Sequence, residues 1–125
     1  MLRALKQLLR SGGRIALTTI YVAPGLSPTA RRKAIRSGPR AVASRSAPSK
    51  LLASAGFVGV EAFDLTEEFA DCARSWVSEW EDHAAVLAPL EPPGEYEERQ
   101  RDRRIQLAAV EAGLLRRGLF SATRA

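Results

Sequence analysis

The chain begins with a pattern of apolar residues at helical spacing and then changes to the pattern of a buried strand. Leucines that recur every three or four residues predict an opening amphipathic helix, at Leu2, Leu5, Leu8 and Leu9. The glycines of residues 11–13 are expected to end it. Residues 14–22, RIALTTIYV, are uncharged on both faces after Arg14. Such a strand is typical of the interior of a sheet that helices cover on both sides.

The middle of the chain predicts two short helices and a second strand. Residues 23–45 form a basic loop rich in Pro, Gly and Ser, in which Ser27 and Pro28 predict a helix that runs to about Arg36. Ser46 is expected to cap a further helix that Gly56 ends. Residues 57–65 then read FVGVEAFDL, which predicts a strand.

The last part of the chain predicts a long helical pair and a final strand. Thr66 is expected to cap the first helix, whose apolar stripe consists of Phe69, Cys72, Ala73, Trp76, Val77, Trp80, Ala84 and Leu87. Prolines near residue 90 end this helix, and a second helix follows from Glu95 to about Leu115. Its buried face is expected to include Tyr96, Leu107, Val110 and Leu114. We expect a turn at Arg117-Gly118 and a short last strand over residues 119–123.

This order of elements predicts a sheet that is incomplete. A strand, a helix and a strand in succession imply a parallel pair joined by a right-handed crossover. Only three strands are visible, and the one over residues 14–22 is apolar on both faces, so we expect a further strand beside it that this sequence does not contain.

Three segments carry motifs in a consistent order. Residues 8–18 read LLRSGGRIALT, residues 51–57 read LLASAGF, and residues 116–124 read RRGLFSATR. Together they resemble class I S-adenosylmethionine-dependent methyltransferases, in which such segments lie at strand five, at the helix that enters strand six, and at a last strand inserted antiparallel between the two. Ser11 stands where that family usually has proline.

The resemblance covers nearly the whole chain but only the C-terminal half of a family domain. It implies an α/β fold class, namely a partial Rossmann-like three-layer sandwich of strands five, six and antiparallel seven with an added helical pair. Residues 1–66 and 116–125 would form the sheet core. Residues 67–115 would form a helical insertion on the substrate side.

The family's cofactor-binding residues have no counterpart in this sequence. The family holds S-adenosylmethionine with a Gly-x-Gly loop after strand one and an acid that ends strand two. No Gly-x-Gly occurs here, and the first acid is Glu61. The resemblance therefore implies S-adenosyl-L-methionine as cofactor of the complete domain, with no cofactor-binding residue in this chain and no binding by the chain alone. The expected partners are a missing N-terminal half or a separate cofactor-binding chain, and a small-molecule acceptor.

Composition excludes several other kinds of site. The single cysteine, Cys72, cannot form an internal disulfide, and with the single histidine, His83, it leaves no usual zinc motif, so we expect no metal site. No run of about 18 apolar residues occurs, so we expect no membrane span. With a single cysteine, we take a reducing cytoplasm as the default compartment.

Charge is distributed unevenly and leaves two alternative functions open. Residues 1–60 contain 11 Lys or Arg and no acid, whereas the rest contains 8 basic and 14 acidic residues. A small nucleic-acid-binding module would use Arg31, Arg32, Lys33, Arg36, Arg40 and Arg45. Nucleic acid is disfavoured, because no aromatic residues alternate with these cations to stack on bases. The other alternative is a non-catalytic partner that completes another protein's sheet through the strand of residues 14–22.

Four residues are candidates for a substrate pocket. Trp76, Trp80 and His83 share a helix face, where they would form an aromatic wall with His83 as a weak candidate for a general base. The alternative is that the tryptophans pack in the core, with a partly exposed histidine beside them. Tyr21 ends the central strand, where its hydroxyl would contact substrate or its ring would cap the sheet. Cys72 is expected to be a small buried apolar residue, and no other catalytic residue is assigned.

Overall fold

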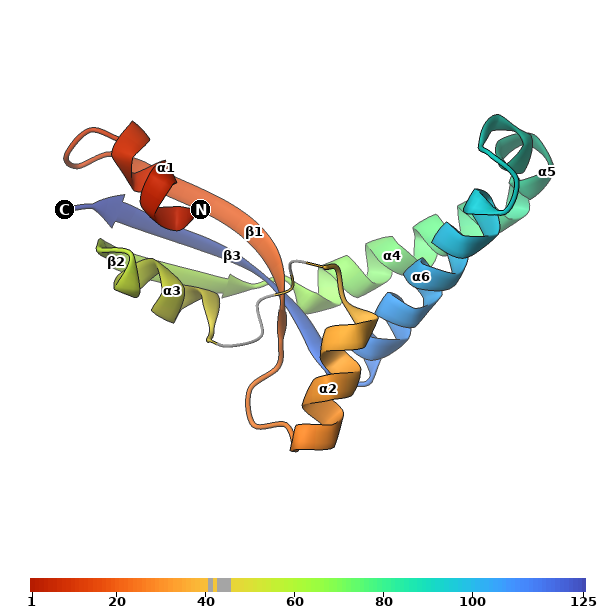
Figure 1. The fold of residues 1–125 in the computed structure, drawn as a ribbon, viewed down its shortest axis with the longest axis horizontal. Coiled ribbons are helices and arrows are strands. Elements are labelled where there is room, and N and C mark those ends of the chain that lie inside the picture. Colours follow the sequence, from red (N-terminus) through yellow and green to blue (C-terminus); the bar gives the residue numbers. More distant parts are fainter. Residues whose placement is uncertain (41, 43–45) are drawn as a thin grey trace.

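The computed structural model describes residues 1–40, 42 and 46–125 as a three-stranded sheet with helices on both faces and a projecting helical arm (Figure 1). The elements in chain order are α1 (Leu2–Leu8), β1 (Arg14–Val22), α2 (Pro28–Ser37), α3 (Pro48–Ser54), β2 (Phe57–Asp64), α4 (Thr66–Asp82), α5 (Ala84–Leu87), the 3-10 helix η1 (Ala88–Leu90), α6 (Glu95–Glu111) and β3 (Leu115–Arg124). No helix in these described ranges combines the length and apolar composition that a membrane span requires.

The last strand lies in the middle of the sheet. The strand order is β1-β3-β2, and β3 pairs antiparallel with both neighbours. β1 and β2 are therefore parallel to each other. The predicted insertion of the final strand between the other two is confirmed, and so is the predicted α/β fold class.

β3 begins earlier than the sequence suggested. The helix before it ends at Glu111, and the turn is made at Gly113, whose φ of 77° is left-handed. The predicted turn at Arg117-Gly118 is wrong, because both residues pair within the sheet. Gly118 is needed there for space, since a Cβ at this position would lie 2.8 Å from the ring of Phe120.

Two of the three predicted helix caps are also wrong. Ser27 caps α2 as expected, with its hydroxyl 3.1 Å from the backbone nitrogen of Ala30. Ser46 does not cap α3, because the N-cap position is Ala47 and Pro48 starts the helix. Thr66 is the first residue of α4 rather than its cap.

Apolar side chains gather in two clusters, one on each face of the sheet. On one face of the sheet, odd-numbered residues of β1 such as Leu17 pack with α1 and α3 around Leu52 and Phe120. On the other face Ile20 and Val22 pack toward α2, α4 and α6, around buried residues that include Leu115. This alternation follows from the two-residue period of a strand.

β1 forms one edge of this sheet, and its outer edge has no strand partner within the described chain. None of its residues is fully buried, and Ala16 and Thr18 are exposed on the face that no helix covers at that point. An apolar strand at a sheet edge is unusual, because unpaired amide and carbonyl groups attract other chains. That a further strand covers this edge stays a prediction.

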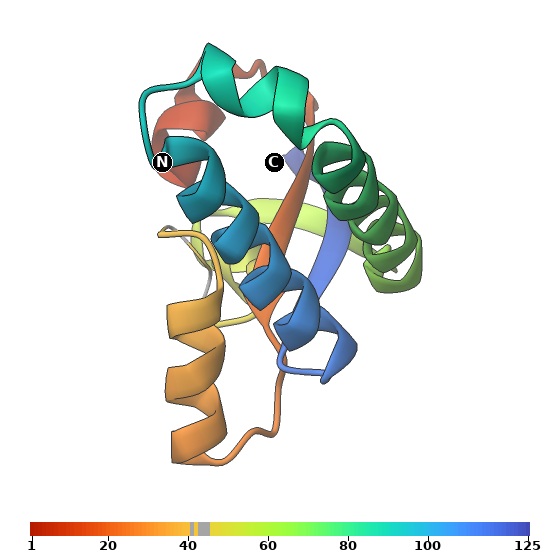
Figure 2. The same cartoon turned by 90° about the vertical axis from the view of Figure 1, so that its right-hand side faces the viewer.

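α4 and α6 pack side by side and project from the sheet as an arm, with α5 and η1 at its tip (Figure 1). Viewed end-on, α6 lies between α4 and α2 (Figure 2). The predicted buried face of α6 is confirmed: Tyr96 and Val110 are buried, and Leu107 and Leu114 pack against the core. Arm and sheet together enclose an open angle.

Candidate functional site

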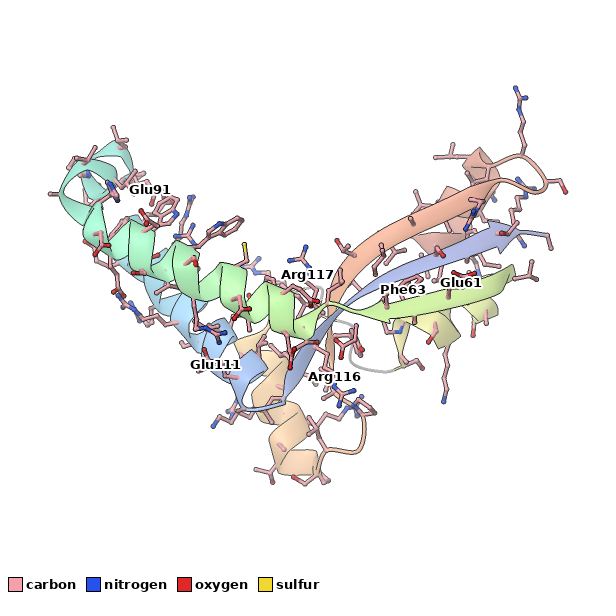
Figure 3. All side chains as sticks on the ribbon, turned by 180° about the vertical axis from the view of Figure 1, so that it is seen from behind. Glu61, Phe63, Glu91, Glu111, Arg116 and Arg117 are labelled. Carbon is pink, nitrogen blue, oxygen red and sulfur yellow. The ribbon has the colours of Figure 1, made fainter. Side chains whose placement is uncertain are left out.

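The angle between the arm and the sheet contains a cavity of about 250 Å³, here called the vertex pocket. Its lining residues come from β1, α4, α6 and β3: Ile20, Phe69, Ala73, Trp76, Val77, Arg103, Gln106, Leu107 and Arg117. Figure 3 shows Arg117 where the arm meets the sheet. The pocket thus lies near the carboxyl end of β1, which is where open α/β sheets bind ligands.

Arg117 is fixed at this vertex by both its backbone and its side chain. Its backbone nitrogen donates to the Thr66 hydroxyl over 3.1 Å, and its carbonyl accepts from the Leu65 nitrogen over 2.9 Å. The guanidinium lies 4.7 Å from the centre of the Phe69 ring and donates to the Thr18 hydroxyl over 3.5 Å. No ion pair joins Arg117 to a carboxylate of the described residues. The vertex pocket therefore has a half-buried positive group that can face a ligand.

The two tryptophans have different surroundings. Trp76 is 59% exposed and lines the vertex pocket, so it does not belong to the core. Trp80 is half-buried inside the arm, where its ring stacks on Tyr96 at 6.1 Å and lies 4.2 Å below the guanidinium of Arg103. Arg103 also lines the vertex pocket, so it connects the two tryptophan positions.

His83 lies at the end of α4, toward the tip of the arm. Its side chain is 61% exposed, and Nδ1 is 2.8 Å from the Glu79 carbonyl oxygen. It does not line the vertex pocket. Cys72 is exposed on α4, so the prediction that it is a buried apolar residue is wrong.

Tyr21 belongs to a second cavity, on the opposite face of the sheet from the vertex pocket. This cavity of about 460 Å³, here called the strand-end pocket, is formed by the end of β1, the loop after it, and the first turns of α2 and α3. The Tyr21 ring is edge-on to Phe120 at 5.8 Å. Three cations also line the pocket, namely Arg31, Lys50 and Arg116. The structure therefore separates Tyr21 from Trp76, and separates both from His83.

The sequence did not identify Arg103, Arg116 and Arg117 as site residues. The sequence does contain a signal for Arg116 and Arg117. Adjacent residues of a strand point to opposite faces, so two neighbouring arginines in a strand indicate one cation on each face of the sheet. The expected turn at Arg117-Gly118 concealed it. Arg45, named above in the basic set, lies outside the described residues.

Asp64 is the last residue of β2. Its carboxylate accepts hydrogen bonds from the Thr66 hydroxyl over 2.5 Å and from the Thr66 backbone nitrogen over 3.0 Å. These bonds, with a smaller contribution from the charge of Arg116, hold the pKa of Asp64 below its usual value. The carboxylate is thus ionised at neutral pH, and its hydrogen bonds are made to Thr66, the first residue of α4.

The side chains at these pockets do not fit a usual S-adenosylmethionine site. Such a site needs paired glycines after a strand and an acid for the ribose hydroxyls. Gly25 follows β1 with a φ of 77°, but it stands alone, and the strand-end pocket beside it is lined by cations rather than by an acid. The described residues also contain no cluster of three or more His, Cys, Asp or Glu that could hold a metal ion.

Comparison with known proteins relates the chain to methyltransferases through its structure. No protein-family profile and no curated protein sequence matches it. Among solved structures, phosphoethanolamine N-methyltransferase 2 of Haemonchus contortus, in complex with phosphomonomethylethanolamine and S-adenosylhomocysteine, superposes with a TM-score of 0.77 at 14% identity. A putative sarcosine dimethylglycine methyltransferase of Galdieria sulphuraria superposes with a TM-score of 0.79 at 14% identity. Mycolic acid cyclopropane synthase CmaA1 in its apo form gives a TM-score of 0.77 at 18% identity.

These matches cover almost all of this chain but only part of each other protein. The superpositions span 98%, 99% and 98% of this chain and 29%, 46% and 52% of the three structures. The chain thus spans about half or less of the length of the proteins it resembles. The antiparallel strand between two parallel ones is the arrangement that the methyltransferase resemblance implied. The expected likeness is therefore confirmed for the fold: this chain has the fold of one part of an S-adenosylmethionine-dependent methyltransferase.

Proposed function

We propose that this chain is the C-terminal, substrate-side part of an S-adenosylmethionine-dependent methyltransferase that acts on a small molecule. The cofactor side is supplied by a preceding half of the same polypeptide or by a separate chain, and residues 1–125 are inactive without it. The observation that carries this proposal is the open edge of β1, in a fold that spans 29%, 46% and 52% of the three solved structures compared above.

The surroundings of β1 support the same proposal. An apolar cavity of about 510 Å³ lies between α1, β1 and α3, lined by residues that include Leu2, Leu17, Leu51 and Leu52. Leu51 is 38% exposed there. An unpaired strand edge beside an apolar hollow fits a partner that adds a strand and covers the hollow.

The contribution of this chain to the reaction is to bind and orient the acceptor. When bound, S-adenosylmethionine supplies a methyl group on a sulfonium, and transfer requires the acceptor atom in line with it. Alignment of this kind lowers the barrier by removing translational and rotational freedom before the reaction. Trp76 and Arg117 face the vertex pocket from two different elements, so they fit the role of positioning the acceptor.

Titration calorimetry with S-adenosylmethionine tests the proposal. The chain alone should give no binding heat, because it lacks the glycine loop and the ribose-binding acid. Reading the gene upstream of Met1 should reveal a Gly-x-Gly loop after an apolar strand within about 150 residues, the size of half such a domain. Co-expression with that segment, or with a separate chain that carries such a loop, should give binding in the micromolar range.

Two results would contradict the proposal. One is micromolar binding by residues 1–125 alone. The other is a folded, stable assembly with a Gly-x-Gly segment that binds no cofactor. The proposed cytoplasmic compartment is checked separately by fractionation of cells that produce the tagged protein, and recovery in a secreted fraction would contradict it.

A further inference from the structure

The strand-end pocket concentrates positive charge at the carboxyl end of β1. Arg31, Lys50 and Arg116 line it, together with the hydroxyl-bearing residues Tyr21 and Ser46, and none of the described residues that line it is an acid. Holding a neutral acceptor for methyl transfer does not require three cations. The charge therefore needs its own explanation.

Three separate elements bring these cations together. Arg31 lies in the first turn of α2, where its backbone nitrogen donates to the Ser27 carbonyl over 2.8 Å. Lys50 lies in the first turn of α3, and its backbone nitrogen donates to the Ala47 carbonyl over 3.0 Å. Arg116 pairs with Tyr21 across the β1–β3 ladder. Figure 3 shows Arg116 near the loop that connects β1 to α2.

The charges of Lys50 and Arg116 are not cancelled by carboxylates of the described residues. Asp64 is close enough to Arg116 to be affected by its charge, but Thr66 already donates two hydrogen bonds to the Asp64 carboxylate. Neither Lys50 nor Arg116 forms an ion pair within the described part of the chain. Clustered like charges repel, so such a pocket is better suited to a bound anion than to water alone.

We propose that the strand-end pocket binds a phosphate group carried by the small acceptor. This inference rests on the proposed function and names the chemical class of its substrate. Guanidinium groups form paired hydrogen bonds with phosphate oxygens, and an ammonium group adds a point charge. Lys50 and Arg116 supply two positive charges, which match a phosphate dianion better than a carboxylate, which carries one charge. The volume of about 460 Å³ leaves room for more of the acceptor beside the phosphate.

The test is a titration of the ¹⁵N-labelled chain with inorganic phosphate, followed by amide chemical shifts. We expect saturable shifts in residues 21–26 and 46–50, with a Kd of about 1 mM for so small a probe. Lys50→Gln and Arg116→Gln should each weaken binding about tenfold, because each removes one charge-assisted contact. Circular dichroism melting confirms that each variant is folded.

Matched controls remove one positive charge elsewhere. Lys33→Gln changes an exposed residue of α2 that does not line the pocket, and Arg101→Gln changes an exposed residue of α6. Both should leave phosphate binding unchanged within twofold. Benzoate replaces phosphate as the carboxylate probe, and a short single-stranded oligonucleotide as the nucleic-acid probe.

Several outcomes would overturn the inference. These are no saturable phosphate binding, binding of benzoate as tight as that of phosphate, or an equal loss in all four variants. Oligonucleotide binding that persists near physiological salt, and that Lys33→Gln weakens as much as Lys50→Gln does, would assign the cations to nucleic acid instead. The phosphate titration needs no cofactor, so its failure leaves the methyltransferase proposal intact. If the chain assembled with a Gly-x-Gly segment binds no S-adenosylmethionine, the methyltransferase proposal fails, whatever the phosphate titration shows.

Discussion

At the scale of single residues, Asp64 makes the stability of the chain depend on pH in acid. Hydrogen bonds from the Thr66 hydroxyl and backbone nitrogen lower the pKa of Asp64 below 3.8, the value expected for the unfolded chain. A lowered pKa means that this stabilisation is complete above the unfolded value and is lost as the pH falls through the folded one. We expect the free energy of unfolding, measured with urea, to fall between pH 5 and pH 3 in part through this group.

Asp64→Asn isolates that contribution, because asparagine still accepts hydrogen bonds but carries no charge. The variant should lose less stability than the wild type on going from neutral to acid pH. Asp102→Asn removes an exposed carboxylate of α6 for which no described contact is seen, and it should keep the wild-type dependence. Parallel curves for wild type and Asp64→Asn would show that Asp64 does not contribute.

Residue-level sequence rules succeeded where a single local signal decides the structure. Ser27 before Pro28 correctly marked the start of α2. Thr66 was assigned as a cap by the same rule, but Asp64, two residues earlier, accepts the hydrogen bond from its nitrogen. Both residues are good caps, and the choice depends on β3, since Thr66 is also bonded to Arg117. That contact spans 51 positions of the chain and leaves no local trace in the sequence.

At the scale of elements, one buried tyrosine contributes a hydrogen bond that joins the two long helices of the arm. The Tyr96 hydroxyl donates to the carbonyl oxygen of Trp80, in the last turn of α4, where helix carbonyls lack partners within the helix. Tyr96→Phe keeps the stacked ring but leaves that carbonyl without this donor. We expect a loss of about 1 kcal/mol in the free energy of unfolding and faster hydrogen exchange in residues 77–83.

Tyr21→Phe is the matched control for this experiment. It removes the same atom from a half-buried ring whose hydroxyl forms no hydrogen bond seen among the described residues. Its stability should change by much less. Equal losses in the two variants would contradict the role given to Tyr96.

The order of elements was predictable, but their ends were not. All three strands and the helical pair were expected from periodicity, and all are present. The boundary between α6 and β3 was misplaced because Gly113 and Gly118 both look like turn residues. Only Gly113 has a left-handed φ, whereas Gly118 makes room for a ring that the sequence does not place there. The same error hid the opposite directions of Arg116 and Arg117, and with them both cationic pockets.

At the scale of the whole molecule, the sequence predicted which elements exist and how the strands are ordered, because those follow from pattern and motif. It did not predict how the candidate residues are grouped. Trp76, Trp80 and His83 share a helix face, yet the arm projects from the sheet, so only Trp76 reaches the vertex pocket. Tyr21 lies on the opposite face of the sheet, in the strand-end pocket, with three cations that come from distant parts of the chain. Such groupings depend on the angle between arm and sheet, which no local periodicity specifies.

The open edge of β1 also predicts how the isolated chain behaves. An apolar strand with one unpaired edge acts as a template for another copy, so residues 1–125 alone should self-associate as their concentration rises. Natural edge strands avoid this with lysine. Ala16→Lys places such a charge at an exposed position of β1. Sedimentation velocity should show less self-association of this variant than of the wild type. Ala108→Lys adds the same charge on exposed α6 and should have no such effect. A wild-type chain that stays monomeric at high concentration would show that the edge is already protected, and the argument for a missing strand would then fail.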